Sequence, residues 1–147
     1  GNRPRLLSSQ GTRTMRVLIF GCNRLSSSLV AGLAAEGNQI TVLSGERDCL
    51  EIVASHPGVR VVLTAEPMMQ DYLQEGGIDH ADVFLAMSSD DHQNLLVAQI
   101  AKQIFNVPKV VCHLASPQLQ VMYAALGLDV VGYSLGLLQD VRRAIEQ

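Results

Sequence analysis

Residues 15–37 read MRVLIFGCNRLSSSLVAGLAAEG, and this stretch decides the fold. It opens with an apolar run, Met15–Phe20, and passes through Gly21 into a segment in which leucines recur every four residues. The short apolar run predicts a buried strand, and the four-residue repeat predicts one face of a helix that ends at Gly37. The stretch therefore predicts a strand, a tight turn and a helix, which together form the first half of a βαβ unit.

The same alternation continues to the end of the chain. Val, Ile and Leu dominate the later apolar runs, which do not alternate cleanly with polar residues, as in parallel strands covered by helices on both faces. The six strands that we expect are Met15–Phe20, Gln39–Leu43, Val59–Leu63, Ala81–Met87, Lys109–Leu114 and Leu128–Gly132, and the last helix is expected at Ser134–Gln147. We predict an α/β fold: a Rossmann-like, doubly wound, six-stranded parallel sheet with helices on both faces.

Length and charge restrict the domain organisation and the partners. A chain of 147 residues fits one domain. Residues 1–14, GNRPRLLSSQGTRT, lack apolar periodicity and carry three arginines, so we interpret them as a flexible basic arm or linker before a domain at 15–147. With 11 basic and 14 acidic side chains and a net charge of −3, the chain has no broad basic surface, which argues against a nucleic-acid partner.

The cysteines and histidines give no sign of a metal centre. Three cysteines without a C-x-x-C pair indicate free thiols in a reducing compartment. The four histidines show neither i, i+4 pairing nor a cysteine partner at metal-binding spacing, so no metal site is expected. The cysteines are Cys22, Cys49 and Cys112, and the histidines are His56, His80, His92 and His113.

No membrane span is expected from the sequence. Its apolar runs of four to six residues fall far short of the roughly 18 that a membrane span requires.

The turn after the first strand occupies the place of a dinucleotide-binding glycine loop. Of the three glycines in G-x-G-x-x-G only Gly21 remains, with Asn23 and Ser26 at the other two positions. Asn tolerates a positive φ and Ser is small, so we expect the loop still to turn. The following helix would present backbone N–H groups and its positive dipole end to an anion. An ordinary turn without a ligand is the alternative. The candidate phosphate-binding residues are Gly21, Cys22, Asn23, Arg24 and Leu25.

The end of the second strand lacks the acid that usually accepts hydrogen bonds from a ribose. Ser44 stands in its place, and Arg47 follows three residues later. A hydroxyl followed by an arginine suits a 2′-phosphate, whereas Glu46 offers a substitute carboxylate one turn later. A third interpretation is that Ser44 caps the second helix while Arg47 is solvated.

Other loops are expected to reach the same edge of the sheet. Glu66 follows the third strand, Met87 and Ser88 follow the fourth, and His113 ends the fifth. We interpret Ser88-Ser89-Asp90-Asp91 as the start of the fourth helix, a serine cap followed by acids that favour the helix dipole. Asp90 and Asp91 also resemble paired carboxylates for acid–base or metal chemistry, but a capping role is the preferred interpretation. For His113, a packed or solvated histidine competes with a phosphate contact. Cys22 lies at a helix start, which would lower the pKa of a thiol, so redox sensing is one interpretation of this residue. It has no visible base and orienting partner, so no catalytic residue is assigned.

Together, several motifs resemble the regulator-of-potassium-conductance family, also called TrkA-N or KTN domains. The resemblance begins at about Arg16 and continues to the C-terminus. It rests on the run from Leu73 through Gly77-Ile78, Ala81-Asp82 and Ala86 to Ser88, Asp90, Asp91 and Asn94, then on Asn106-Val107-Pro108 and on Leu126-Gly127-Leu128-Asp129-Val130-Val131.

The resemblance implies a regulatory domain, not an enzyme. Members bind NAD(H), ATP, ADP or AMP in the crevice without chemistry, pair as homodimers or higher assemblies through helices near the chain end, and gate a potassium channel or transporter. It implies a cytoplasmic location at the inner face of the membrane. By position, the resemblance implies that Gly21, Asn23 and Arg24 bind the phosphates. Ser44 occupies the position of the acid that binds the ribose. Glu66 occupies the position of the Asp in a Gly-Asp pair, and His113 a position where an Arg is common in the family.

Two alternatives remain open from the sequence. The first is the cofactor lobe of a small NAD(P)-dependent oxidoreductase, although no Tyr-x-x-x-Lys pair is present. The second is a degenerate module that binds no nucleotide and assembles through its last helix alone. Erosion of the glycine loop and of the ribose acid is what keeps the second alternative open.

Overall fold

The computed structural model describes residues 14–133 and 136–146. Six strands form one parallel sheet in the order β4-β3-β2-β5-β6-β7. These strands span Arg16–Phe20 (β2), Gln39–Ser44 (β3), Val59–Leu63 (β4), Val83–Ala86 (β5), Lys109–His113 (β6) and Asp129–Val131 (β7). The doubly wound fold predicted from the sequence is confirmed, with each strand within two residues of its expected ends.

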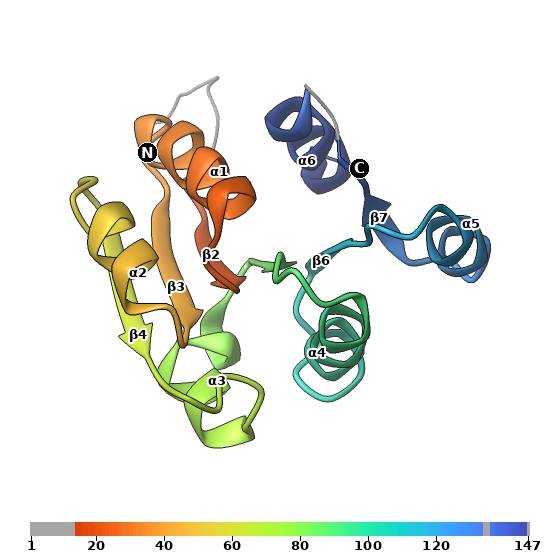
Figure 1. Ribbon diagram of the computed structural model, residues 1–147, viewed down its shortest axis with the longest axis horizontal. Helices are drawn as coiled ribbons and strands as arrows, with labels where there is room; N and C mark the ends of the chain where they lie inside the picture. Colours follow the sequence, from red (N-terminus) through yellow and green to blue (C-terminus); the bar gives the residue numbers. More distant parts are fainter. Residues whose placement is uncertain (1–13, 134–135, 147) are drawn as a thin grey trace, which may run out of the picture.

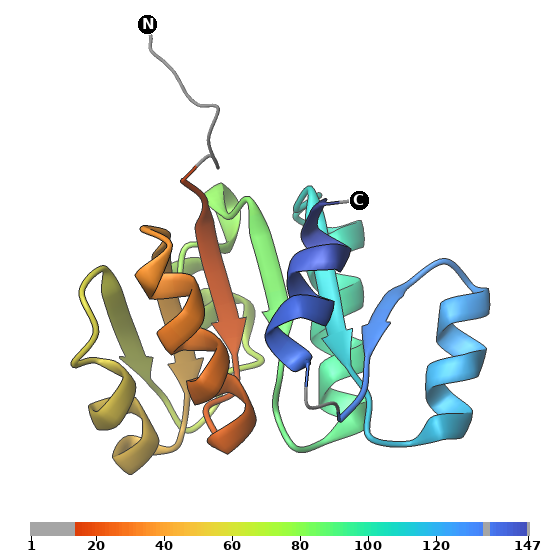
Figure 2. The same cartoon turned by 90° about the horizontal axis from the view of Figure 1, so that it is seen from above.

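Helices cover both faces of the sheet (Figures 1 and 2). Those of one face are α1 (Arg24–Ala35), α2 (Arg47–Val53) and α6 (Leu137–Glu146). Those of the other face are α3 (Gln70–Glu75), the 3₁₀ turn η1 (Ile78–His80), α4 (Asp91–Gln103) and α5 (Pro117–Ala125). The two hydrophobic cores lie between these layers and the sheet.

The central strand β2 sets the geometry of the sheet. It pairs with β3 on one side and β5 on the other, so that Val17 lies between Ile40 and Val83. Its last four residues are buried because helices lie above and below them. The chain leaves β2 toward β3 and later returns to β5, and the strand order reverses at this point. In such sheets the loops on either side of the reversal diverge and leave a crevice at the carboxyl ends.

Helix α6 packs against its own sheet. The apolar stripe of Leu137, Val141 and Ile145 is buried in the same core as α1, and Arg142 forms an ion pair with Glu36 at the end of α1. The apolar face on which the last-helix assembly hypothesis depended is therefore covered within the chain. Two parts of the sequence prediction lie outside the described residues. They are the ends of the last helix, at residues 134, 135 and 147, and nearly all of the proposed arm at 1–14.

Candidate functional site

A cleft of about 670 Å³ opens at the carboxyl ends of the central strands. We call it the α1 cleft. It is bounded by the loops after β2, β3, β4 and β5, which supply most of its lining. Its lining residues are Phe20, Gly21, Cys22, Asn23, Ser44, Gly45, Glu46, Asp48, Cys49, Ala65, Pro67, Ser88, Ser89 and Gln93.

Gly21 is required at this position for two independent reasons. Its φ is +96°, a left-handed conformation that side chains rarely adopt. In addition, a Cβ at this position would lie 2.6 Å from Ser88 Cα, which is backbone and cannot move aside like a side chain. The loops after β2 and β5 thus approach each other so closely that only glycine fits.

Asn23 caps α1, so the expectation that it takes a positive φ is wrong. Its φ is −158° and its Oδ1 accepts the Ser26 N–H at 3.0 Å, while Ser26 Oγ accepts the Asn23 N–H at 3.0 Å. The Asn23 side-chain amide also donates to the Met87 carbonyl at 2.9 Å and joins the two loops of the reversal point. An Asn can accept and donate at once, which a glycine at this position cannot.

The capping box leaves two backbone donors at the start of α1. A helix begins with four N–H groups that have no intrahelical acceptor, and here Asn23 and Ser26 bind each other's side chains. Arg24 and Leu25 are the first two helical residues, and their N–H groups have no acceptor among the described residues. The Arg24 side chain is exposed outside the lining of the cleft. Any anion bound at this helix start is therefore held chiefly by backbone and dipole.

Two carboxylates line the cleft just after β3, the strand end at which a dinucleotide-binding fold usually has its ribose-binding acid. Ser44 is buried and its Oγ accepts the Glu46 N–H at 3.0 Å, so it stabilises a turn and does not cap α2, whose N-cap is Glu46. Glu46 and Asp48 line the cleft, whereas Arg47 is exposed and does not. Sequence reasoning weighed Glu46 but missed Asp48. Its position in the first turn of α2, just after Ser44, is the signal by which it could have been found.

The remaining predicted residues divide between the cleft and the core. Ser88 lines the cleft. The N-cap of α4 is Asp90, so the expected serine cap is wrong, while the capping role preferred for the acids is confirmed at Asp90. Met87 is buried, and Glu66 is exposed away from the lining. The Asp91 carboxylate accepts the N–H groups of Ala115 and Ser116 at 2.8 and 3.0 Å and so fixes the loop after β6.

His113 lies in the core. It is 1% exposed, its ring is edge-on to Tyr133 with 4.7 Å between centroids, and neither ring nitrogen has a hydrogen-bond partner among the described residues. Burial lowers the pKa of His113, and the nearby Asp91 carboxylate only partly opposes this. His113 does not line the cleft. Its backbone carbonyl accepts from the Asn94 amide nitrogen, which also donates to the Ser88 carbonyl. A packed histidine is thus what the structure places at this strand end.

The expectation of free thiols is wrong for two of the three cysteines. Cys22 and Cys49 form a disulfide with their Cα atoms 5.8 Å apart, while Cys112 is free and buried. The pair lies 27 residues apart in sequence, and only the packing of α1 against α2 brings the two together. In the described ranges no three His, Cys, Asp or Glu side chains gather as a metal site would require, and no helix there has the length and hydropathy to cross a membrane.

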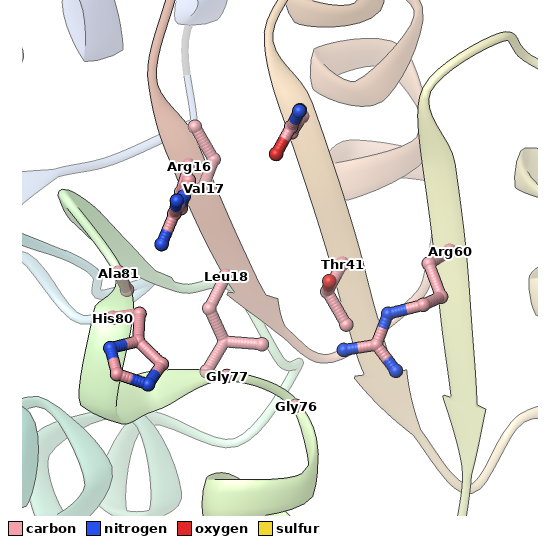
Figure 3. Close-up of a pocket in the computed structure, with 10 residues that line it drawn as sticks. Arg16, Val17, Leu18, Thr41, Arg60, Gly76, Gly77, His80 and Ala81 are labelled. Atoms are coloured by element: carbon pink, nitrogen blue, oxygen red, sulfur yellow. The ribbon is translucent and has the colours of Figure 1, made fainter.

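A second concavity, the η1 hollow, has a volume of about 230 Å³ and lies over the sheet beside η1. Two arginines and a histidine, Arg16, Arg60 and His80, line it around Leu18 and Thr41. Figure 3 shows Arg60 reaching from β4 toward Thr41, with His80 on the opposite side. The Arg60 guanidinium donates to the Glu75 carbonyl at 3.2 Å, which holds this side chain along the rim.

The cleft, its glycine turn and the reversed strand order are shared by doubly wound folds, and the family follows from the sequence match. Residues 17–134 match the TrkA-N domain. The chain belongs to the TrkA-N domain family. The Trk system potassium uptake protein TrkA of Streptomyces coelicolor is 32% identical over 117 residues, which cover 80% of this chain and 52% of that protein. The TrkA of Vibrio alginolyticus is 30% identical over 104 residues, or 71% and 22%. The chain thus spans about half of one relative and about a fifth of the other.

Solved structures show the same fold. The TrkA-N domain of the inner membrane protein ybaL from Escherichia coli superposes with a TM-score of 0.69 at 17% identity, over 91% of this chain and 96% of that one. The Shewanella denitrificans Kef C-terminal domain in its AMP-bound form gives 0.70 at 16% identity, over 82% and 72%. The GsuK channel bound to NAD gives 0.65 at 18% identity, over 81% and 21%.

Proposed function

We propose that this TrkA-N domain binds NAD(H) or an adenine nucleotide in the α1 cleft and uses that binding, without chemistry, to regulate a potassium channel or transporter from the cytoplasmic side of the membrane. The observation that carries the proposal is the open cleft at the start of α1, where two backbone N–H groups remain for a phosphate. Curated relatives of this domain are potassium uptake proteins, which supports the regulatory context.

The lining favours a nucleotide with free ribose hydroxyls. Glu46 and Asp48 offer carboxylate acceptors for hydroxyl groups, and both would repel a 2′-phosphate. Neither Arg24 nor Arg47 lines the cleft to offset that repulsion. We therefore expect NAD(H), AMP, ADP or ATP to bind in preference to NADP(H).

Regulation without chemistry is consistent with the residues at hand. The lining holds two carboxylates and several hydroxyls, and its two sulfur atoms are joined as a disulfide, so it offers no free thiol nucleophile. Some structural neighbours are oxidoreductases, such as an imine reductase in complex with NAD⁺ at 14% identity, but that likeness is one of fold alone. Nucleotide binding would change the relative free energies of the domain's conformations. A coupling free energy of about 1–3 kcal/mol between the nucleotide site and a second site corresponds to a change of roughly five- to 150-fold in binding affinity.

A thermal-shift titration with NAD⁺, NADH, NADP⁺, AMP, ADP and ATP tests the proposal. At roughly a hundredfold excess over Kd, a ligand stabilises the folded state by about 2.7 kcal/mol, and about 2–4 °C of Tm follows from each kcal/mol. We expect at least one nucleotide without a 2′-phosphate to raise Tm, and NADP⁺ to raise it less. Adenosine serves as the phosphate-free control. A flat Tm across the panel would contradict nucleotide binding.

We propose further that the domain forms a homodimer through α5. None of the nine residues of this helix is buried, and Val121, Met122 and Leu126 are exposed by 74%, 53% and 74%. Exposed apolar surface of this kind typically marks a contact with another chain. Light scattering of Val121→Asp is expected to show a monomer, while Ile52→Asp, at a similarly exposed position on α2, should leave the assembly intact. A dimer that persists in Val121→Asp would exclude this face.

A further inference from the structure

The Cys22–Cys49 disulfide joins the two segments between which a nucleotide would lie. Cys22 stands just before the N-cap of α1, and Cys49 is the third residue of α2. Both line the α1 cleft. One segment carries the free N–H groups of Arg24 and Leu25, and the other carries Asp48. The bond therefore fixes the distance between the candidate phosphate site and the candidate ribose site.

The disulfide lies at the base of the cleft and does not fill it. Cys22 is 5% exposed and belongs to the core that includes Val30, Leu50 and Val53, and Cys49 packs against that core. The cleft keeps about 670 Å³ with the bond in place. A covalent link beneath an open site lowers the entropy that a ligand must remove on binding, because the two walls are already held at a fixed distance.

The two sulfur atoms differ in access. Cys49 is half-buried and lines the cleft, whereas Cys22 is only 5% exposed, so Cys49 is the half of the bond that a reductant is expected to approach. A thiolate released at Cys22 would face the positive end of the α1 dipole, which stabilises the leaving group. The third cysteine does not compete: burial, assisted by the Asp91 carboxylate, raises the pKa of the Cys112 thiol to about 12.

We propose that Cys22 and Cys49 form a reversible thiol–disulfide site for a dithiol reductant, and that the oxidised pair gives the α1 cleft its high affinity for nucleotide. A thiolate of the dithiol attacks Cys49 Sγ, forms a mixed disulfide and releases Cys22 as a thiolate, which takes up a proton. The second thiol of the reductant then displaces Cys49, and the reductant leaves as a disulfide with two electrons fewer. The same exchange with a disulfide oxidant restores the bond. The affinity part of this inference rests on the function proposed above.

The cellular location proposed above and the place of the bond at the cleft favour a reversible redox disulfide over a permanent structural one. On the cytoplasmic side of the membrane, a location that rests on the function proposed above, disulfides are usually transient and redox-sensing. Disulfides open to solvent are also the labile ones, and this one borders an open cleft. Reduction is expected to let the loop at residues 21–24 and the first turn of α2 move independently, while the sheet is untouched.

Hydrogen exchange measured by mass spectrometry on the oxidised and the dithiothreitol-reduced protein tests the site without any nucleotide. We expect reduction to increase exchange in residues 22–27 and 45–50, and to leave residues 109–113 in β6 unchanged. The variant with both Cys22→Ser and Cys49→Ser should match the reduced form and ignore dithiothreitol, while Cys112→Ser should respond like the parent protein. Unchanged exchange on reduction, or a bond that excess dithiothreitol does not reduce, would overturn the inference.

Calorimetric titration of both forms with AMP and NAD⁺ tests the affinity. We expect reduction to weaken binding about five- to 20-fold, within the usual range for coupled sites. Equal affinity in the two forms overturns the redox inference while leaving the proposed function standing. No binding in either form contradicts the proposed function and the affinity claim with it, while an exchange response still confirms the thiol–disulfide site.

Discussion

The α1 cleft and the η1 hollow are both concave, and they differ in what lines them. The cleft is lined by backbone, hydroxyls and two carboxylates, and the hollow by two arginines and a histidine around Leu18 and Thr41. By side-chain charge alone, the hollow is the better anion site. The cleft nevertheless holds the start of α1, with two N–H groups free, and about three times the volume. Backbone geometry, not surface charge, thus distinguishes the candidate nucleotide site.

The largest expected effect comes from Gly21→Ala in the cleft, matched with Gly77→Ala beside the hollow. Both glycines have similar positive φ angles, +96° and +93°, but a Cβ at Gly77 meets nothing within 4 Å. Urea unfolding should show a loss of about 3 kcal/mol or more for Gly21→Ala and about 1 kcal/mol for Gly77→Ala. Equal losses would show that close approach to Ser88 contributes nothing.

Ser26→Ala removes the capping box at the start of α1. The Ser26 hydroxyl is buried, accepts the Asn23 N–H and donates to the Gly21 carbonyl at 3.0 Å, so its loss leaves buried partners unsatisfied. We expect thermal or urea unfolding to report about 1–2 kcal/mol of destabilisation. Ser27→Ala is the control, because the Ser27 hydroxyl donates only to the Arg24 carbonyl of the same helix, and it should cost less than about 0.5 kcal/mol.

Charge reversal compares the two concavities directly. Arg24→Glu places a negative charge on the first residue of α1, next to the N–H groups proposed for phosphate. We expect AMP affinity to fall about three- to tenfold at low salt, and less at high salt because the side chain is exposed. Arg60→Glu in the hollow should leave Kd for AMP unchanged in the same calorimetric titration. A larger loss in Arg60→Glu would move the phosphate site to the hollow.

The smallest effect is a pH dependence that separates His113 from His80 of the hollow. Because the pKa of His113 is lowered in the folded protein, the unfolded chain binds a proton that the folded one does not once the pH falls below about 6.5. Stability is therefore full above that pH and declines below it, by at most about 1.4 kcal/mol per pH unit. Urea unfolding between about pH 7.5 and 5.5 should show a weaker decline in His113→Gln than in His80→Gln, which replaces an exposed ring. Identical slopes would exclude His113 as the source.

Part of the site could be found from the sequence because it follows strand ends. Gly21, Ser44 and Ser88 each come at the end of a run of buried apolar residues, and carboxyl ends of parallel strands meet at one edge. Roles that depend on side-chain direction were less predictable. Asn23 had the right location but the wrong conformation, since an Asn can either adopt a positive φ or cap a helix, and only the neighbouring Ser26 and Met87 decide between them.

The sequence by itself determined the six parallel strands, the helices between them and the family, because apolar periodicity and short motifs are local properties of the chain. Tertiary structure alone decided that Cys22 reaches Cys49, that His113 is enclosed beside Tyr133 and that Asp48 faces the cleft. Each of these depends on how two separate elements pack against each other, and the distance between residues on different elements cannot be read directly from their order in the sequence. A site made at the meeting of four loops is therefore located by the sequence, while its chemistry is set by the packing.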